Sequence, residues 1–389
     1  MNPDFFMPLP EGARFILDTL ATAGHEGYCV GGCVRDALLG LSPKDYDICT
    51  DASPEEMQRI FASQRVIETG LQHGTLTVLY DGQPYEVTTY RIDGDYTDHR
   101  RPDSVIFVRE LAQDLARRDF AVNAMAYNPQ KGLIDLFDGQ NDLKKRLIRC
   151  VGEAHRRFDE DALRILRALR FAAVYDFDIE AETANAAHEL CPTLSHVAKE
   201  RITVEFSKLV CGQAAQSILQ AHANVLSAVL PCVLHTDGLS ETPAKLPLRL
   251  AHVLQDVQEI KAVLSLLRFD NATAQAVTEL IAQKDAEMPA SDAEWKLMLH
   301  KLGQERTLQL SAWKKWNSES LQAILARGDC WNLKMLAVTG KDLMAVGVPK
   351  GKPVGIALER LLMEVIKGSV CNTKEALLHK LHSFEKSIV

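Results

Sequence analysis

The secondary structure that the sequence favours changes near residue 140. Before that point short apolar runs alternate with helix starts, whereas from about Leu143 onward helical periodicity dominates. Four segments of the first part have the pattern of strands, the last two joined around Asp81-Gly82: Gly27–Val30, Asp45–Thr50, Leu76–Tyr80 and Tyr85–Arg91. This predicts an α/β N-terminal part, a small mixed sheet with helices, followed by an elongated all-α remainder.

Short sequence signals also predict where helices form. In the first part they predict helices over Glu11–Ala23 and from Cys33, and Ser53 followed by Pro54 is a strong N-cap signal. In the remainder they predict these helices: Asp159–Val174, Ala181–Leu190, Lys199–Val210, Ala215–Ala228, Leu246–Leu267, Ser291–Leu302, Ser318–Ala326, Gly340–Val346, Gly355–Ile366 and Thr373–Phe384.

Length and composition limit the class of protein. The chain has 389 residues, 47% hydrophobic and 25% charged, which is typical of a globular protein with several domains. Breaks in the pattern near Gly139, Cys211-Gly212 and Pro289 predict domains at 1–139, 140–211, 212–288 and 289–389.

Three features predict a cytoplasmic protein outside membranes. The first twenty residues carry Asp4, Glu11 and Asp18, whereas a secretory signal needs a basic start and a continuous apolar stretch. No apolar run approaches the roughly 18 residues of a membrane span. Nine cysteines are scattered from Cys29 to Cys371, which favours reduced, mostly buried thiols, with a redox or metal role as the alternative.

A basic strip lies within a chain whose net charge is −8. Residues 140–170 contain nine Lys or Arg against five Asp or Glu, so this stretch is positive while the remainder is acidic. Nearby charge sets the field at a surface within a Debye length of about 8–10 Å, so the strip could hold phosphates. A solvated helix face is the equally weighted alternative.

Two groups of residues in the first part point to phosphate chemistry. Gly31 and Gly32, between a predicted strand and a helix start, let backbone N–H groups approach a phosphate, and Arg35 adds a bidentate donor. Asp45 and Asp47 alternate on a predicted strand, so both carboxylates point to one face. Two carboxylates on one face suit Mg²⁺ and predict metal-dependent phosphoryl or nucleotidyl transfer.

These motifs resemble the nucleotidyltransferase signature of class II CCA-adding enzymes and bacterial poly(A) polymerases. Four further segments resemble later motifs of the family, in the same order: Arg117–Ala124 for the ribose, Ile134–Leu143 for a hinge, Glu160–Arg164 for the base, and Glu200-Arg201 with Glu205 for a stabilising helix. The resemblance covers residues ~25 to ~210. Beyond them it is limited to a C-terminal segment at 347–368. It implies template-independent addition of CCA to the 3′ end of tRNA from CTP and ATP, with release of pyrophosphate.

The resemblance also assigns the predicted domains. Residues 1–139 become the catalytic head, 140–211 the neck that recognises the base, 212–288 the body, and 289–389 a tail that binds tRNA. Asp45 and Asp47 hold Mg²⁺, and Glu86 is the candidate third carboxylate, with an exposed strand residue as its alternative. Gly31, Gly32 and Arg35 bind the triphosphate.

Base selection can be argued from hydrogen bonding. Asp159 as an N-cap would place Asp161 and Arg164 on one face of a helix. A carboxylate accepts from an exocyclic amino group and a guanidinium donates to a ring nitrogen, which suits cytosine and adenine and rejects uracil and guanine. The alternative is that Asp161 and Arg164 form an ordinary ion pair on a surface helix. The motif also includes Arg167.

The remaining candidates concern ribose and RNA. The resemblance places Asp119 on the ribose 2′-OH, with Arg118 and Asn123 near the nucleotide; a basic helix start is the alternative for Arg117 and Arg118. The RNA-binding candidates are Arg117, Arg156, Arg157, Lys350 and Lys352. Lys314-Lys315 between Trp313 and Trp316 could grip phosphates, but tryptophans at this spacing favour a core.

A polar loop at Ile92–Asp103 has the character of a lid, or else of a passive surface loop. In the family such a loop accompanies the change from C to A addition, so it favours full CCA or A-only addition. Poly(A) polymerase and a non-catalytic RNA-binding protein are weaker alternatives, the second because Asp45 and Asp47 are both present. An appended phosphohydrolase would need an adjacent His-Asp pair, and the helical remainder contains none. No protein partner is evident.

Overall fold

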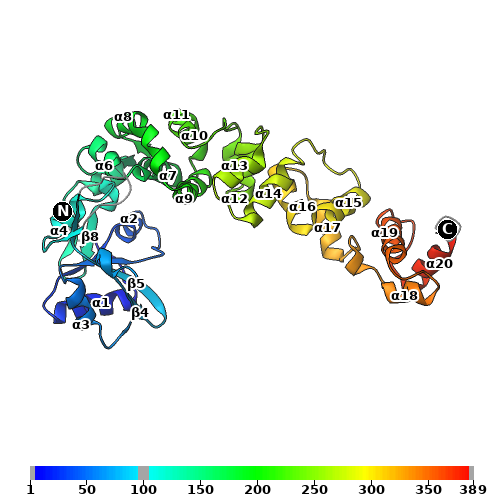
Figure 1. Cartoon of the computed structure of the whole chain (residues 1–389), viewed down its shortest axis with the longest axis horizontal. Helices are drawn as coiled ribbons and strands as arrows, with labels where there is room; N and C mark the ends of the chain where they lie inside the picture. Colours follow the sequence, from blue (N-terminus) through cyan, green and yellow to red (C-terminus); the bar gives the residue numbers. More distant parts are fainter. Residues whose placement is uncertain (1–4, 95–104, 385–389) are drawn as a thin grey trace. The chain divides into compact units, whose positions relative to one another are not determined.

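The computed structural model describes residues 5–94 and 105–384 and divides into two compact units (Figure 1). One unit comprises residues 1–240 and 257–269, and the other comprises 241–256 and 270–389. The finer division at 139, 211 and 288 stays a prediction.

A seven-stranded mixed sheet forms the centre of the head, in the order β3-β4-β5-β2-β1-β8-β9. Its strands are β1 (Gly27–Val30), β2 (Asp47–Thr50), β3 (Arg65–Ile67), β4 (Thr75–Tyr80), β5 (Gln83–Thr89), β8 (Met125–Asn128) and β9 (Gly132–Asp135). Only β2 and β5 pair in parallel, and the other neighbours are antiparallel. The predicted α/β class with a mixed sheet is confirmed.

Local signals explain several of these elements. Asp81 and Gly82 both have positive φ, 49° and 79°, as a tight two-residue hairpin turn requires, and they join β4 to β5 as predicted. Ser53 and Glu56 form a capping box at the start of α3 (Pro54–Ile60). The other head helices are α1 (Glu11–Thr22), α2 (Gly32–Leu38) and α4 (Leu111–Ala116).

A small hairpin lies at the predicted polar loop, Ile92–Asp103. Strands β6 (Arg91–Asp93) and β7 (Val105–Phe107) pair antiparallel. Residues 95–103 of the loop lie outside the described residues, and its role as a lid stays a prediction.

The segment predicted as the neck is mainly helical. Its helices are α5 (Gly139–Lys145), α6 (Ala154–Glu160), α7 (Leu163–Tyr175), α8 (Ala181–Leu190) and α9 (Lys199–Val210). Two short strands, β10 (Leu147–Ile148) and β11 (Asp178–Ile179), pair in parallel, which the all-α prediction omitted. Helix α7 packs on α9 and carries nine of its thirteen residues buried, so it forms the centre of this part.

The later helices are more broken than predicted. Two predicted long helices each divide in two, at His222 and at 255–259, and α14 and α16 were not predicted. The helices are α10 (Ala215–Ala221), α11 (Ala223–Ser227), α12 (Leu246–Leu254), α13 (Ile260–Leu266), α14 (Asn271–Ile281), α15 (Asp292–Leu302), α16 (Gln304–Trp313), α17 (Glu319–Arg327), α18 (Gly340–Ala345), α19 (Lys352–Ile366) and α20 (Lys374–Phe384). Short 3₁₀ turns occur at Leu71–His73, Ala121–Asn123, Cys191–His196, Leu239–Glu241 and Leu333–Met335.

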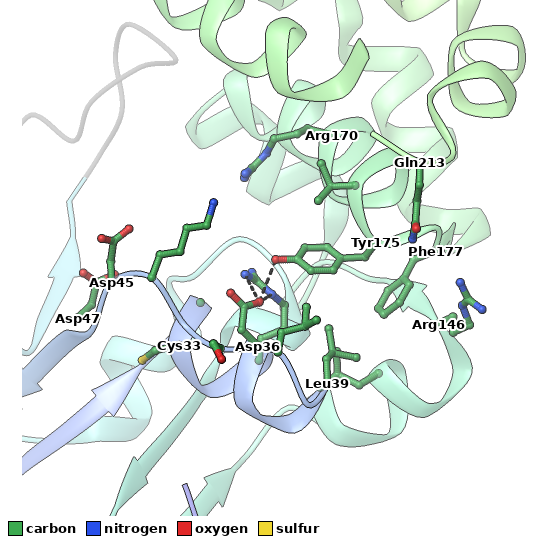
Figure 2. Close-up of a pocket in the computed structure, with 17 residues that line it drawn as sticks. Cys33, Asp36, Leu39, Asp45, Asp47, Arg146, Arg170, Tyr175, Phe177 and Gln213 are labelled. Atoms are coloured by element: carbon green, nitrogen blue, oxygen red, sulfur yellow. Dashed lines mark hydrogen bonds and ion pairs between the residues drawn. The ribbon is translucent and has the colours of Figure 1, made fainter. Parts of the chain in front are cut away.

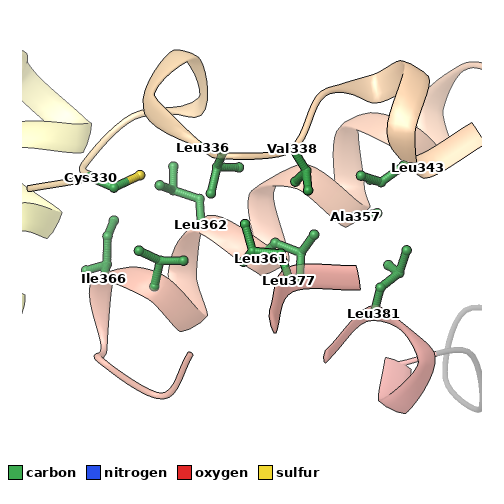
Figure 3. Packing of buried hydrophobic residues seen from close by; sticks show 11 residues of the cluster. Cys330, Leu336, Val338, Leu343, Ala357, Leu361, Leu362, Ile366, Leu377 and Leu381 are labelled. Carbon is green, nitrogen blue, oxygen red and sulfur yellow. The ribbon is translucent and has the colours of Figure 1, made fainter. Parts of the chain in front are cut away.

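The C-terminal helices share a core of their own (Figure 3). Leu361 and Leu362 of α19, Leu377 of α20 and Leu343 of α18 belong to one cluster of apolar side chains, and all four are fully buried. The sequence produces this core because apolar residues recur at helical spacing on each of the three helices. Among the described residues, no helix combines the length and apolar character needed to cross a membrane.

Candidate active site

The chain turns sharply at Gly31, between β1 and α2. Gly31 has φ 78° and ψ −126°, a conformation in which a side chain is strained. A Cβ at this position would stand 3.3 Å from Arg118 Nη1, so the guanidinium packs directly against the bare turn. Gly31 is therefore needed for the turn itself and for the approach of Arg118.

Three carboxylates gather beside this turn. Asp47 begins β2 opposite Val30 of β1, and Glu86 lies on the neighbouring strand β5. Loss of water around its carboxyl raises the pKa of Asp47, and the negative charges of Glu86 and Asp45 raise it further, while Arg118 lowers it. Asp45 and Glu86 are thus both close enough to Asp47 to repel its carboxylate.

Asp45 is not on a strand, contrary to the prediction that both aspartates alternate along one. Strand β2 begins only at Asp47, and Asp45 lies in the exposed segment that leads into it. Within residues 5–94 and 105–384, no three His, Cys, Asp or Glu side chains are gathered tightly enough to hold a metal ion by themselves. Mg²⁺ is commonly held by one or two carboxylates together with substrate phosphates, so this donor set fits such an ion.

A cavity of about 910 Å³ opens beside the carboxylates (Figure 2). One wall comes from α2 and the segment before β2, including Lys44, Asp45 and Asp47. The opposite wall comes from the neck and includes Arg170 and Tyr175 of α7. The cavity is large enough for a nucleotide and presents both acidic groups and basic groups to it.

Arg35 lies in the cavity wall, 6% exposed, between the head and the neck. Its Nε and Nη2 atoms donate to Asp36 Oδ1 at 2.9 and 2.7 Å, and its Nη1 atom donates to Asn123 Oδ1 at 2.5 Å. A guanidinium has five N–H groups, so these bonds leave donors for a phosphate. The sequence did not indicate that Asp36 and Asn123 orient Arg35, because Asn123 is 88 residues away.

Asp119 lies at the centre of a buried polar network. Its Oδ2 atom accepts from Arg167 Nε and Nη2 at 2.8 and 2.6 Å, and its Oδ1 atom accepts from Asn123 Nδ2 at 3.1 Å. Burial would raise the pKa of Asp119, but Arg167, Asn123 and Arg164 together lower it to about 2. Three residues predicted for the ribose and the base, Asp119, Asn123 and Arg167, are thus brought together.

The predicted helix carrying Asp161 and Arg164 is wrong. Asp159 lies inside α6, and Asp161 caps the end of that helix in an extended conformation, with φ −140° and ψ 103°. Arg164 belongs to α7, which begins at Leu163. The two residues therefore lie on either side of a break between two helices and do not share one face of a continuous helix.

Each member of this pair has its own partner. Arg201 Nη2 donates to Asp161 Oδ2 at 3.0 Å. Arg164 Nη1 donates to Glu160 Oε2 at 2.6 Å and to the carbonyl oxygen of Arg157 at 3.0 Å. Both side chains are oriented by these contacts, as base-reading groups need to be, and Glu160 is an orienting residue that sequence reasoning did not single out.

Arg117 and Arg118 converge on one fully buried carboxylate. Arg117 Nη2 donates to Asp114 Oδ1 at 2.6 Å, and Arg118 Nη2 donates to Asp114 Oδ2 at 2.9 Å. Burial would raise the pKa of Asp114, but the two arginines lower it. The spacing of three and four residues from Asp114 on α4 was the available signal for this cluster.

The basic strip at 140–170 is largely an ion-pair network. Arg149 pairs with Asp142, and Arg167 pairs with Asp119. Arg156 and Arg157 both reach Glu160, but Arg156 is exposed whereas Arg157 is buried. Positive charge counted along the sequence therefore overstates the charge available to an RNA.

In the second unit, Lys314 and Lys315 serve as internal contacts. Lys314 Nζ donates to the carbonyl oxygen of Lys284 at 2.6 Å, and Lys315 pairs with Glu241. Trp316 packs on Trp295, whose side chain is buried, in agreement with the preference for a core. Lys350 and Lys352 are exposed on either side of Gly351, at the start of α19.

Three family models match the chain in succession. They are a poly A polymerase head domain over residues 27–149, a probable RNA and SrmB-binding site of polymerase A over 176–233, and a putative tRNA nucleotidyltransferase domain 2 over 244–381. The first of these contains the Gly31 turn and all three carboxylates.

Curated relatives match along almost the whole length. The CCA-adding enzyme of Limosilactobacillus fermentum is 38% identical, with 95% of each chain covered, and that of Enterococcus faecalis is 37% identical, with 93% of each covered. The structure of the Bacillus stearothermophilus CCA-adding enzyme in complex with CTP superposes with a TM-score of 0.81 at 31% identity, covering 98% of this chain and 99% of that one. The Thermotoga maritima CCA-adding enzyme complexed with tRNA shares the fold, with a TM-score of 0.67 at 22% identity and 96% and 95% of the two chains covered. The chain therefore belongs to the family of CCA-adding enzymes, which are tRNA nucleotidyltransferases.

Proposed function

We propose that the cavity beside Asp45, Asp47 and Glu86 is where this chain transfers nucleotides to RNA. Family membership supplies the reaction, which is CCA addition to the 3′ end of tRNA from CTP and ATP. The observation that supports the site most strongly is the gathering of Asp45 and Glu86 around Asp47 beside a cavity of nucleotide size. Loss of water around its carboxyl raises the pKa of Asp47, and the two neighbouring negative charges raise it further. Carboxylates gathered in this way are stabilised by a cation.

Nucleotidyltransferases of this kind use a divalent metal ion, and we assign Mg²⁺ to Asp45 and Asp47, with Glu86 as the third carboxylate. When bound, Mg²⁺ would lower the pKa of the RNA 3′-OH and neutralise triphosphate charge. Asp45 lies on an irregular segment, so it can adjust as the ion and the nucleotide enter.

The triphosphate is assigned to Gly31, Gly32 and Arg35. The Gly31 turn has no side chain to keep a phosphate away from its N–H groups. Arg35 lines the cavity, and its bonds to Asp36 and Asn123 do not use all of its N–H groups, so donors remain for a phosphate. Arg118, which packs on the same turn, adds positive charge next to Asp47.

The ribose is assigned to Asp119 and Asn123, and the base to Asp161, Arg164 and Arg167. Asp161 accepts and Arg164 donates, which suits the amino group and ring acceptor that cytosine and adenine share. Glu160 and Arg201 hold these two side chains and so restrict them to one orientation. Uracil and guanine would place donors against Arg164 and acceptors against Asp161, which destabilises their binding.

The tRNA is assigned to exposed basic residues. Arg156 in the neck and Lys350 and Lys352 in the tail are exposed and can reach phosphates. Arg117 and Arg157 are more strongly engaged in internal ion pairs, so any contact they make with RNA would have to compete with those pairs. We retain the division into head, neck, body and tail at 139, 211 and 288 as part of the proposal. None of the nine cysteines, all of which lie in the described part of the chain, is in a disulfide, which supports a cytoplasmic setting.

The proposal is tested with tRNA that already ends in C or in CC, and with an unrelated RNA. In the presence of Mg²⁺, we expect the first tRNA to gain C and A, the second to gain a single A, and the unrelated RNA to remain unextended. Extension of only the CC-ending tRNA would show an A-adding specialist. Long A tails on every RNA would show a poly(A) polymerase and contradict the proposal.

A further inference from the structure

Tyr175, the last residue of α7, contacts the head across the cavity (Figure 2). Its hydroxyl donates to Asp36 Oδ1 at 2.9 Å, and its ring centroid lies 4.6 Å from the guanidinium carbon of Arg35. Phe171, one turn earlier on α7, places its ring centroid 5.1 Å from the same carbon. The guanidinium of Arg35 therefore lies against two aromatic rings of the neck, an arrangement that attracts a cation.

Asp36 connects the two contacts. Its Oδ1 atom accepts from Tyr175 and also from Nε and Nη2 of Arg35. The bond from Nη1 of Arg35 to Asn123 fixes the orientation of the guanidinium plane further. Burial raises the pKa of Tyr175, Arg35 lowers it and Asp36 raises it again, with a net increase, so the hydroxyl remains a donor at neutral pH.

Helix α7 carries base-reading candidates at its other end. Arg164, Arg167, Phe171 and Tyr175 follow one another at spacings of three, four and four residues, which places them on one face of the helix. Eleven residues at about 1.5 Å each separate Arg164 from Tyr175 by roughly 16 Å. Helix α7 thus joins Arg164 and Arg167, two of the groups proposed for the base, to a contact with the residue proposed for the triphosphate.

We infer that Tyr175 is a positioning residue for nucleotide selection. Through Asp36 and Arg35, it fixes the Gly31–Asp36 segment of the head relative to Arg164 and Arg167 of the neck. A nucleotide whose triphosphate lies at the head then presents its base to the neck in one register only. This inference rests on the proposed function, because it concerns the nucleotides of that same site.

Two variants separate the hydroxyl from the ring. Tyr175→Phe keeps the ring against Arg35 and removes the bond to Asp36, whereas Tyr175→Leu removes both contacts. Tyr127→Phe is the matched control, because Tyr127 is a buried tyrosine of β8 that does not line the cavity. The measurements are kcat and KM for CTP and for UTP, with tRNA that lacks CCA, and KM for that tRNA.

For Tyr175→Phe we expect kcat/KM for CTP to fall about 10-fold, mainly through KM for the nucleotide, with KM for tRNA unchanged. For Tyr175→Leu we expect a loss of about 100-fold. The preference for CTP over UTP should fall about 10-fold in Tyr175→Leu, because the base is no longer held in one register. Tyr127→Phe should match the wild type.

The ratio of kcat/KM for CTP to kcat/KM for UTP distinguishes a role of Tyr175 in positioning the nucleotide from a role in folding. A variant that is partly unfolded loses activity with CTP and UTP in equal proportion, so its ratio is that of the wild type. If both Tyr175 variants keep the wild-type ratio and the wild-type KM for CTP, Tyr175 does not position the nucleotide and the inference is overturned. If the wild-type protein itself adds no nucleotide, the proposed function fails instead, so the two failures can be told apart.

Discussion

Asp119 and Arg167, 48 residues apart in the sequence, form a two-pronged ion pair in which Nε and Nη2 of Arg167 both donate to Asp119 Oδ2. The pair joins the segment after α4 to the middle of α7. It leaves Asp119 with a pKa of about 2, below the ordinary value of 3.8, despite its burial. Because the pair is buried, its charge state affects both stability and the shape of the nucleotide site.

The lowered pKa of Asp119 makes stability depend on pH in acid. A carboxyl whose pKa is lower in the folded state contributes stability that is fully present above about pH 4 and is lost as the pH falls toward 2. Between pH 5 and pH 3 this group should account for a loss of about 1 kcal/mol in the free energy of unfolding. Urea unfolding of the wild type and Asp119→Asn at both pH values measures it. Equal losses in the two proteins would contradict the prediction.

Replacement of Gly31 should damage the site more than backbone strain alone explains. Gly31→Ala places a Cβ 3.3 Å from Arg118 Nη1 in a conformation that already disfavours side chains, with an expected cost of about 1–3 kcal/mol and loss of nucleotide addition. Gly40→Ala is the control, since Gly40 also has positive φ, 73°, but no atom lies within 4 Å of its Cβ position.

Gly40→Ala should cost about 1 kcal/mol and keep its activity. Urea unfolding and CTP addition to tRNA measure the two effects. Nucleotide addition by Gly31→Ala at the wild-type rate would show that the turn does not contribute to the site.

Neutralising Asp47 should separate activity from stability. Its pKa is raised, first by loss of water and then by Glu86 and Asp45, so its ionised form is unfavourable in the folded protein. A carboxyl whose pKa is raised by folding stabilises the folded protein least when the pH lies above that raised pKa. Asp47→Asn should therefore be at least as stable as the wild type at pH 7. Activity should fall by about 1,000-fold or more because the cation loses a ligand.

Thermal unfolding and a CTP-addition assay at pH 7 test this pair of effects in Asp47→Asn. Asp18→Asn, at an exposed position of α1, provides the control and should change neither quantity. An active Asp47→Asn would remove Asp47 from the catalytic site.

Replacing Asp161 should reduce the selection between bases more than it reduces the rate with a correct nucleotide. In Asp161→Ala the carboxylate that opposes uracil is gone, so the preference for CTP over UTP should fall about 100-fold. Competition between the two nucleotides, read from the product ends, measures the preference. Glu182→Ala, at an exposed position of α8, is a suitable control. Unchanged selectivity in Asp161→Ala would assign base reading to other residues.

Local signals made part of the head predictable. The turn at Gly31 before α2, the Ser53 N-cap and the Asp81-Gly82 turn each depend on a few residues, and each forms as expected. Strands β3, β8 and β9 of the sheet were not predicted. The position of Asp45 was predicted wrongly because an alternating pattern does not say where strand pairing begins; pairing with β1 starts only at Asp47.

Contacts between distant segments could not be predicted in the same way. Asn123 lies 88 residues from its partner Arg35, and Arg167 lies 48 residues from its partner Asp119, so no sequence spacing indicates these two contacts. Helix α14 was missed although Asp270 caps it by accepting from the backbone N–H of Thr273, a signal that the sequence did contain. The break between α6 and α7 was hidden because apolar residues continue at helical spacing across it.

The central claim is tested most directly by sequencing what the protein adds to a tRNA that lacks CCA. With CTP, ATP and Mg²⁺ present, the account predicts three added nucleotides in the order C, C, A, followed by no further growth. A different order, continued growth beyond the A, or no addition by the folded wild-type protein would contradict it.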